Sequence, residues 1–182
     1  ADAALELAFG DLQASADGAL GSAGDRLQFT LRAASLARLD SRAEGSLSAR
    51  GELAGGAGDL FDATSWQAFG VVADVDGRQL RWQDSLRIGA LSGRIELPGL
   101  REGRVALRID AEGLQVAGRP LDRARLRLDG DADAHALQLD ASGPQVSARA
   151  SARGALLSPA GANGWRWQGT VDEFVADAPV PI

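Results

Sequence analysis

The sequence lacks cysteine, methionine, tyrosine and lysine, and these absences exclude several kinds of chemistry. Without cysteine there is neither a disulfide framework nor a reactive thiolate. Without lysine there is no P-loop, because that motif needs a lysine to contact the nucleotide phosphates. All 19 basic residues are therefore arginines, and 25 acidic residues bring the net charge to −6. An acidic chain without a basic block predicts no nucleic-acid partner.

Long apolar runs are also missing. No stretch approaches the roughly 20 apolar residues of a membrane-spanning helix, and no charged segment precedes a short apolar one as in a signal peptide. The chain begins at Ala1 and has no methionine, so we expect a processed or excised piece of a longer protein. Aromatic residues make up only 5% of the chain. They are few for a closed β-sandwich, which uses large side chains to fill the space between its sheets.

What the sequence does contain is a two-residue alternation of apolar and polar residues from one end to the other. Segments 5–9, 27–31, 105–109 and 137–139 follow it strictly, mainly with Leu, Val, Ile and Phe. Successive side chains of a strand point to opposite faces, so each segment predicts a strand with one apolar and one polar face. The predicted fold is therefore almost wholly β, within the size of a single domain.

The expected elements follow from this alternation and from the turn residues between the segments. Asp76-Gly77 predicts a hairpin turn over residues 75–78. Residues 35–39 break the alternation and indicate a helical turn or a loop. Residues 55–58, Gly-Gly-Ala-Gly, are the best candidate for a mobile loop. Strands are expected at residues 5–11, 18–20, 27–33, 45–53, 69–74, 79–83, 85–88, 90–97, 104–112, 114–116, 123–129, 135–141, 145–156 and 165–174.

A short internal repeat accompanies these strands. Residues 48–53, Ser-Ala-Arg-Gly-Glu-Leu, recur as Ser-Ala-Arg-Gly-Ala-Leu at 151–156, and residues 92–97 are similar. The central glycines Gly51 and Gly154 lie within strand patterns, and Gly93 occupies the matching place at 92–97. Such glycines indicate a bulge or bend in a curved sheet.

No constellation of residues predicts catalysis. A nucleophilic triad would have to use His135, the sole histidine, and no Gly-x-Ser-x-Gly motif supplies the serine. Residues 129–140 have the acidic spacing of a calcium loop, but Ala134 replaces the required glycine and the flanks indicate strands instead of helices. We therefore predict a solvated turn with His135 opening the next strand. The sequence predicts no catalytic residue, no metal site and no cofactor.

The four tryptophans have two interpretations. Trp82, Trp165 and Trp167 fall in or beside alternating segments, whereas Trp66 lies in an expected loop. Core packing is the default role for such residues. The alternative places them at the rim of an apolar groove, where an amphipathic ring contacts both water and hydrocarbon.

The second half of the chain has the order of motifs of a known family. Alternating strands from Gly103 to Gly130 lead to His-x-Leu-x-Leu at 135–139. An alanine-rich strand to Gly154 follows, and then Trp-x-Gly-x-hydrophobic at 167–171. This order resembles the TamB family, inner-membrane components of the bacterial translocation and assembly module within the wider AsmA-like group of bridge-like lipid-transfer proteins. The resemblance covers residues 45–174 and is most specific from Gly103 onward.

The resemblance implies an all-β fold: an elongated, open, curved sheet, or β-taco, whose U-shaped groove has an apolar interior. It implies that residues 1–182 are a single β-rich segment of a longer TamB-like protein. It further implies a periplasmic location, an inner-membrane anchor outside this segment, and a TamA-like outer-membrane barrel as partner. The implied role is movement of phospholipid between the two membranes, with an association to autotransporter assembly.

Three functional interpretations stay open. The first is a lipid conduit, since an exposed aliphatic face suits acyl chains, which need no polar contacts. The second is a surface that holds unfolded β-strands through exposed sheet edges. The third is a closed sandwich or barrel that serves only as a spacer. The lining expected for the conduit is Leu5, Leu7, Phe9, Leu27, Phe29, Leu31, Leu80, Trp82, Ile95, Leu97, Val105, Leu107, Ile109, Leu126, Leu128, Leu137, Leu139, Trp165 and Trp167.

Overall fold

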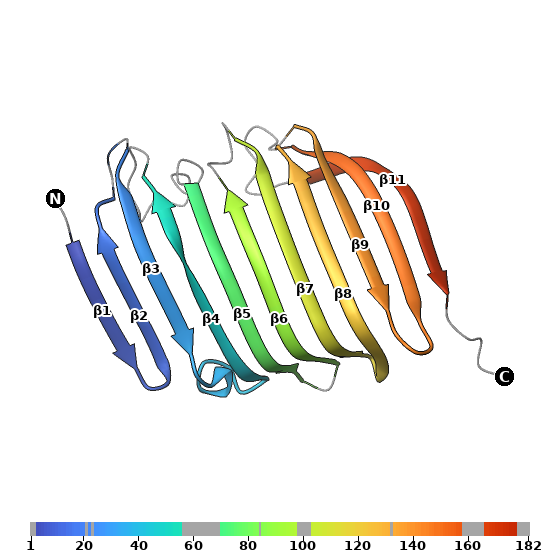
Figure 1. Ribbon diagram of the computed structural model, residues 1–182, viewed down its shortest axis with the longest axis horizontal. Coiled ribbons are helices and arrows are strands. Elements are labelled where there is room, and N and C mark those ends of the chain that lie inside the picture. The colour runs from blue at the N-terminus through green and yellow to red at the C-terminus, as the bar shows by residue number, and fades with distance from the viewer. Residues whose placement is uncertain are drawn as a thin grey trace.

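The computed structural model is one open antiparallel sheet in which each strand pairs with the next along the chain (Figure 1). It describes residues 3–20, 22, 24–55, 70–83, 85–97, 103–131, 133–157 and 166–177. These residues form 11 strands and one 3-10 turn, η1. The bounds are β1 Ala3–Phe9, β2 Leu12–Gly18, β3 Arg26–Ala33, η1 Leu36–Arg38, β4 Ala43–Ala54, β5 Gly70–Trp82, β6 Leu86–Leu97, β7 Val105–Val116, β8 Arg119–Gly130, β9 His135–Ser142, β10 Ser147–Leu157 and β11 Arg166–Asp177.

The sheet does not close on itself. β1 and β11 lie at opposite ends of the strand order, and within the described ranges they do not pair with each other. The expected all-β, open and curved sheet is therefore confirmed. The interpretation as a closed sandwich or barrel is wrong, because the described strands form a single layer with two free edges (Figure 1).

Strand register gathers the apolar residues on one side, which we call the apolar face. Directly opposed residues on neighbouring strands share a face, so each row can be followed across the whole sheet. One such row consists of Leu7, Ala14, Leu31, Ala49, Val75, Gly93, Ile109, Leu126, Leu139, Ala150 and Phe174. The residues between these rows, mainly Arg, Asp, Glu, Ser and Gln, form the opposite, polar face.

A single layer has no enclosed core. Among the described residues no large side chain is fully buried, and the buried apolar set is small: Ala33, Ala43, Ala73, Val105, Ala111 and Leu114. The accessible surface is 12283 Å² for a mass of 18.8 kDa. A compact protein of this mass exposes only about 8300 Å². A single layer exposes both of its faces, so an excess of this kind is expected.

The first hairpin differs from the sequence expectation. We expected strands at 5–11 and 18–20, whereas β1 ends at Phe9 and β2 occupies Leu12–Gly18. The chain turns at Gly10, whose φ of 58° lies in the left-handed region that glycine tolerates. β2 was missed because its apolar positions at Ala14 and Ala16 are small, so its alternation is weak.

The hairpin expected at residues 75–78 is wrong. β5 runs without interruption from Gly70 to Trp82, with Asp76-Gly77 in its middle. It pairs along this length with both β4 and β6. Backbone pairing on two sides therefore outweighs the local turn preference of Asp-Gly.

At two further places we expect a break between strands, but the strand is continuous. Each of these two strands contains a glycine at the point where the alternation of apolar and polar residues changes phase. Segments 85–88 and 90–97 belong to β6 around Gly89, and segments 104–112 and 114–116 belong to β7 around Gly113. In β5 the phase changes at Gln79, whose φ is 49°. The shift by one residue returns the following apolar side chains to the apolar face. Leu80 accordingly lies over Gly77, in the neighbouring row of that face.

Other expectations have mixed outcomes. The helical turn expected at 35–39 is confirmed as η1. Of the bulge or bend expected at the repeat glycines, the bulge is wrong, because register is continuous through Gly51, Gly93 and Gly154. The register shifts lie between Glu44 and Ser46 and between Ser151 and Ala152. The mobile loop expected at 55–58 falls mostly on residues outside the described ranges, as does Trp66.

Close backbone approach explains one of the repeat glycines. A Cβ at Gly51 would lie 2.1 Å from the Val72 carbonyl oxygen and 2.8 Å from the Ala73 Cα. We predict that Gly51→Ala lowers the free energy of unfolding by about 1–3 kcal/mol, because the contacting atoms are backbone and cannot move aside. Urea denaturation followed by circular dichroism measures the change.

Gly77→Ala is the matched control for this prediction. Its Cβ would meet side-chain atoms of Leu80, the flexible Cδ1 end at 2.7 Å and Cγ at 3.3 Å, and no backbone atom is among its three nearest neighbours. We expect a smaller loss of stability than for Gly51→Ala. Equal losses from the two variants would show that the backbone contact at Gly51 is not the cause.

Candidate functional site

The expected lining residues converge on the apolar face. Register places every one of them that the structure describes on this face, from Leu5 on β1 to Trp167 on β11. Trp165 lies outside the described residues. The face also contains residues that the sequence did not single out: Leu12, Ala14, Ala16, Leu47, Leu53, Val71, Leu86, Ile88, Leu91, Leu114, Leu121, Ala148, Ala150, Ala152, Val171 and Phe174. Many of these are alanines or lie next to a phase change, so their alternation was harder to recognise.

Exposure of the apolar face is greatest at the two edges. On β1 the exposed fractions of Leu5 and Phe9 are 64% and 74%, and on β11 that of Phe174 is 72%. Toward the middle, Val105 and Leu114 are buried and Leu128 is half-buried. The face is therefore a continuous apolar surface that no other described element covers.

A histidine and a tryptophan form a hydrogen bond near one end of this surface. The Trp167 Nε1–H group donates a hydrogen bond of 2.8 Å to His135 Nε2. The other ring nitrogen, Nδ1, lies 3.1 Å from the Asp131 carbonyl oxygen. Since Nε2 accepts, the neutral ring carries its hydrogen on Nδ1 and donates to that carbonyl. The bond spans from β11 to β9 across β10.

Two glycines leave room for the Trp167 indole. Gly154 and Gly169 pair with each other in the row that contains His135. A Cβ on Gly154 would lie 2.6 Å from the Trp167 ring, and one on Gly169 would lie 2.4 Å from it. Glycine at 154 and 169 thus lets Trp167 lie flat over two strands, which is the structural role of the repeat glycine Gly154.

Trp82 lies near the opposite end of the strands. The Arg42 guanidinium is 5.0 Å from the centroid of its ring, a cation–π distance. Asp40 receives hydrogen bonds from Arg42, and these bonds lower the pKa of Asp40 to about 2. Because Trp82 is 42% exposed and contacts a charged group, it matches the rim interpretation better than core packing.

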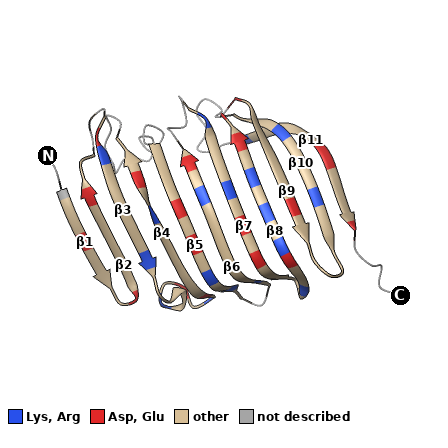
Figure 2. Ribbon diagram, in the orientation of Figure 1, with Lys and Arg blue, Asp and Glu red and all other residues tan. Residues whose placement is uncertain are grey.

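The polar face is organised by ion pairs. Figure 2 shows arginines and acids alternating between neighbouring strands over the middle of the sheet. The hydrogen bond from Arg153 lowers the pKa of Asp172 below its usual value. Exposed pairs of this kind contribute little individually. They join Arg26–Glu52, Arg50–Asp74, Arg94–Asp74, Arg94–Glu96, Arg104–Asp129, Arg123–Glu112, Arg125–Asp110, Arg149–Asp140 and Arg153–Asp172.

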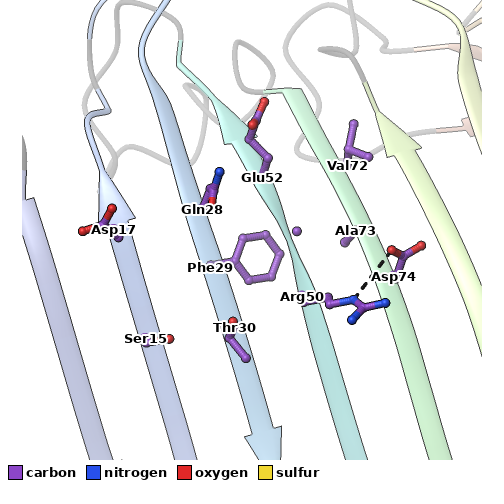
Figure 3. A pocket seen from close by; sticks show the side chains of 11 residues that line it. Ser15, Asp17, Gln28, Phe29, Thr30, Arg50, Glu52, Val72, Ala73 and Asp74 are labelled. Atoms are coloured by element: carbon purple, nitrogen blue, oxygen red, sulfur yellow. Dashed lines mark ion pairs between the residues drawn. The ribbon is translucent and has the colours of Figure 1, made fainter.

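A depression of about 530 Å³ lies over β2 to β5 (Figure 3). Its polar side chains belong to the polar face: Ser15, Asp17, Gln28, Thr30, Arg50, Glu52 and Asp74. Arg50 and Asp74 are 3.9 Å apart at their closest charged atoms. These side chains include no histidine or cysteine and no pair of nucleophile and base, so the depression has no catalytic arrangement.

The acidic segment after β8 is a turn. The Asp131 Oδ1 atom accepts hydrogen bonds from the backbone N–H groups of Asp133 and Ala134, at 3.0 and 2.7 Å. Asp131 and Asp133 are exposed and His135 begins β9, which confirms the expected solvated turn. His135 itself is buried, with 8% of its surface exposed. Across the described ranges, no group of three or more His, Cys, Asp or Glu residues has the arrangement of a metal site.

Together these features define a class: an open β-sheet scaffold that offers a long apolar face and an arginine-acid face. A family model described as "TamB, N-terminal domain" matches residues 3–181, and the chain therefore belongs to the TamB family. No curated protein and no solved structure matches the chain. Within the described ranges, no helix has the length and hydropathy needed to cross a bilayer.

Membership of the TamB family indicates a general function. TamB proteins are transport and assembly components of the translocation and assembly module and are not enzymes. They are anchored in the inner membrane, span the periplasm and work with an outer-membrane partner.

The bond between Trp167 and His135 generates a prediction about β11. We expect His135→Ala to shift one indole N–H resonance and to speed amide hydrogen exchange in β11. The reason is that Trp167 loses its acceptor and the edge strand loses a link to β9. Two-dimensional ¹⁵N–¹H NMR measures both effects. An unchanged indole resonance and unchanged exchange in β11 would contradict the bond.

Proposed function

We propose that this chain is a segment of a periplasm-spanning hydrophobic groove that shields acyl chains and carries phospholipid between the inner and outer membranes. In this proposal residues 1–182 form a single segment, and neighbouring segments of the same chain and a TamA-like outer-membrane barrel are its partners. The expected lining residues contact the acyl chains. The phospholipid headgroups stay in water.

The observation that carries the proposal is the continuous, uncovered apolar face. Soluble monomers rarely expose contiguous apolar patches larger than a few hundred Å². Here the patch follows every described strand from Leu5 to Phe174, and the accessible surface exceeds that of a compact protein. An apolar ligand that lies on this face removes it from water.

Acyl chains fit the chemistry of the face. They gain roughly 0.8 kcal/mol per buried CH₂ and need no hydrogen-bond partner. Among the described residues, the rows of the apolar face carry aliphatic side chains, small residues and a few aromatic rings. Arg119, opposite Val116, is the charged residue in these rows and lies at one end of the strands, and His135 lies at the other end. Without a strong polar contact between these ends, a chain can move along the face instead of being held at one position.

Replacing Leu128 tests the conduit. Leu128 lies on the apolar face, half-buried, opposite Leu107 and Leu137. We predict that Leu128→Arg stays folded, because an open face lets the long side chain extend its charge to water, but that it retains much less phospholipid. Native mass spectrometry with lipid extraction of the purified chain measures the bound lipid, and circular dichroism measures the fold.

Gln28→Arg is the matched control. It adds the same charge on the polar face, where the strand neighbours of Gln28 are Asp17 and Glu52. We expect it to retain as much phospholipid as the original chain. The conduit is wrong if the original chain carries no lipid, or if the two arginine variants lose it equally.

A second function is favoured by the free sheet edges. In the described structure, β1 and β11 each have one side without a paired strand, and all 12 residues of β11 are exposed. Unpaired edges can template an added strand. The alternative proposal is therefore a scaffold that holds β-strands during assembly of outer-membrane proteins or autotransporters.

Ala8 distinguishes this alternative from the conduit. Phe9 and Leu12 close the turn at Gly10 and Asp11, so the N–H of Ala8 points away from β2 toward the free edge. We predict under the strand-holding alternative that Ala8→Pro weakens capture of an unfolded outer-membrane barrel protein diluted from urea, whereas Leu128→Arg does not. Under the conduit, Ala8→Pro leaves the bound phospholipid unchanged. Co-sedimentation measures capture.

A further inference from the structure

Three arginines meet on the polar face in the middle of the sheet. Register places Arg94 of β6 opposite Arg108 of β7, and Arg108 opposite Arg127 of β8. Figure 2 shows blue bands, which mark arginines, on β6, β7 and β8 in the middle of the sheet. All three side chains are exposed. We call these residues the arginine row.

Like charges placed directly opposite each other on neighbouring strands destabilise a sheet. The adjacent row shows the favourable arrangement, because its charges alternate: Asp110, Arg125, Asp140, Arg149. The arginine row lacks this alternation. The repulsion between Arg108 and Arg127 is therefore a local cost. Arg81 and Arg87 are also directly opposed, but Arg81 has an ion pair with Glu44.

The acids that border the row are engaged in ion pairs that include neither Arg108 nor Arg127. Glu96 and Asp74 pair with Arg94, at 2.6 and 3.1 Å, and Asp110 pairs with Arg125 at 2.6 Å. Asp140 pairs with Arg149 at 3.0 Å, and Asp129 pairs with Arg104. Within the described part of the chain, Arg108 and Arg127 have no ion pair. They are two surplus cations on neighbouring strands of a chain whose net charge is −6.

The distance between directly opposed Cα atoms in an antiparallel sheet is about 4.5–5.5 Å. Two guanidinium groups on such neighbours present parallel N–H donors that can reach the same tetrahedral oxyanion. Arginine forms bidentate hydrogen bonds with phosphate, and these charge-assisted bonds are stronger than neutral ones. A bound phosphate group would also remove the repulsion between the two arginines.

We propose that Arg108 and Arg127, flanked by Arg94, form a binding site for a phosphate group on the polar face. The ligand is a lipid headgroup at a membrane surface or a soluble phosphate. This inference does not depend on the conduit, because it concerns the face opposite the acyl-chain lining.

The experiment compares the original chain with the double variant Arg108→Gln/Arg127→Gln. Binding of inorganic pyrophosphate is measured by isothermal titration calorimetry at low salt, and binding of vesicles by flotation. Vesicles of pure phosphatidylcholine are compared with vesicles that contain phosphatidylglycerol. We expect the affinity of the double variant for both probes to be lower by a factor of about ten or more, because hydrogen bonds to charged groups are lost. Its thermal midpoint without ligand should rise at low salt, since the repulsion is removed.

Arg32→Gln is the matched control, because Arg32 is an exposed arginine of the same face whose strand neighbours are Gln13 and Ser48. It should bind the probes as the original chain does and show no rise in thermal midpoint. Binding of phosphatidylglycerol vesicles alone identifies a headgroup as the source, and binding of pyrophosphate alone identifies a soluble phosphate.

Several outcomes would overturn the site. One is an equal loss of binding in Arg32→Gln and in the double variant, since general charge would then explain it. Another is no binding of either probe by the original chain. A third is tight binding of an acidic peptide without binding of phosphate, which would assign the row to a protein partner.

Discussion

The feature on which the rest of this structure depends is a single layer of paired strands with nothing packed against its apolar side. Most β-proteins bury such a side between two sheets or inside a barrel, and the resulting core supplies much of their stability. In the described structure no large side chain is fully buried. Strand pairing and cross-strand contacts within the two faces therefore hold the sheet together, and the apolar side remains available.

The two faces of the sheet differ in the interactions that their side chains make. On the polar face, ion pairs such as Arg125–Asp110 and Arg149–Asp140 place opposite charges on neighbouring strands. On the apolar face, glycines and alanines alternate with large residues, so that Trp167 can cross Gly154 to reach His135. In the proposed function, one face accepts hydrocarbon while the other stays in water.

Most of the strands could be predicted because alternation is a local property. Residues 27–33 and 135–141 show this, as they match β3 and β9 within one residue at each end. β5 could not be predicted as one strand, because Asp76-Gly77 is a strong turn signal and the pairing that overrides it comes from β4 and β6. β2 was missed since alanine gives little contrast with serine and glutamine. The hydrogen bond between Trp167 and His135 had no signal in the sequence, because the two residues are 32 positions apart and on different strands.

The sequence by itself determined which residues of a strand share a face, because the two-residue period follows from the backbone geometry of any strand. It therefore placed Leu107 with Ile109, and Leu126 with Leu128. Only the tertiary structure decided which strands pair, where the alternation changes phase and whether the sheet closes. Those properties depend on hydrogen bonds between segments distant in the chain, and the same alternating sequence is compatible with a closed sandwich or an open sheet. The arginine row and the continuous apolar face are products of that register.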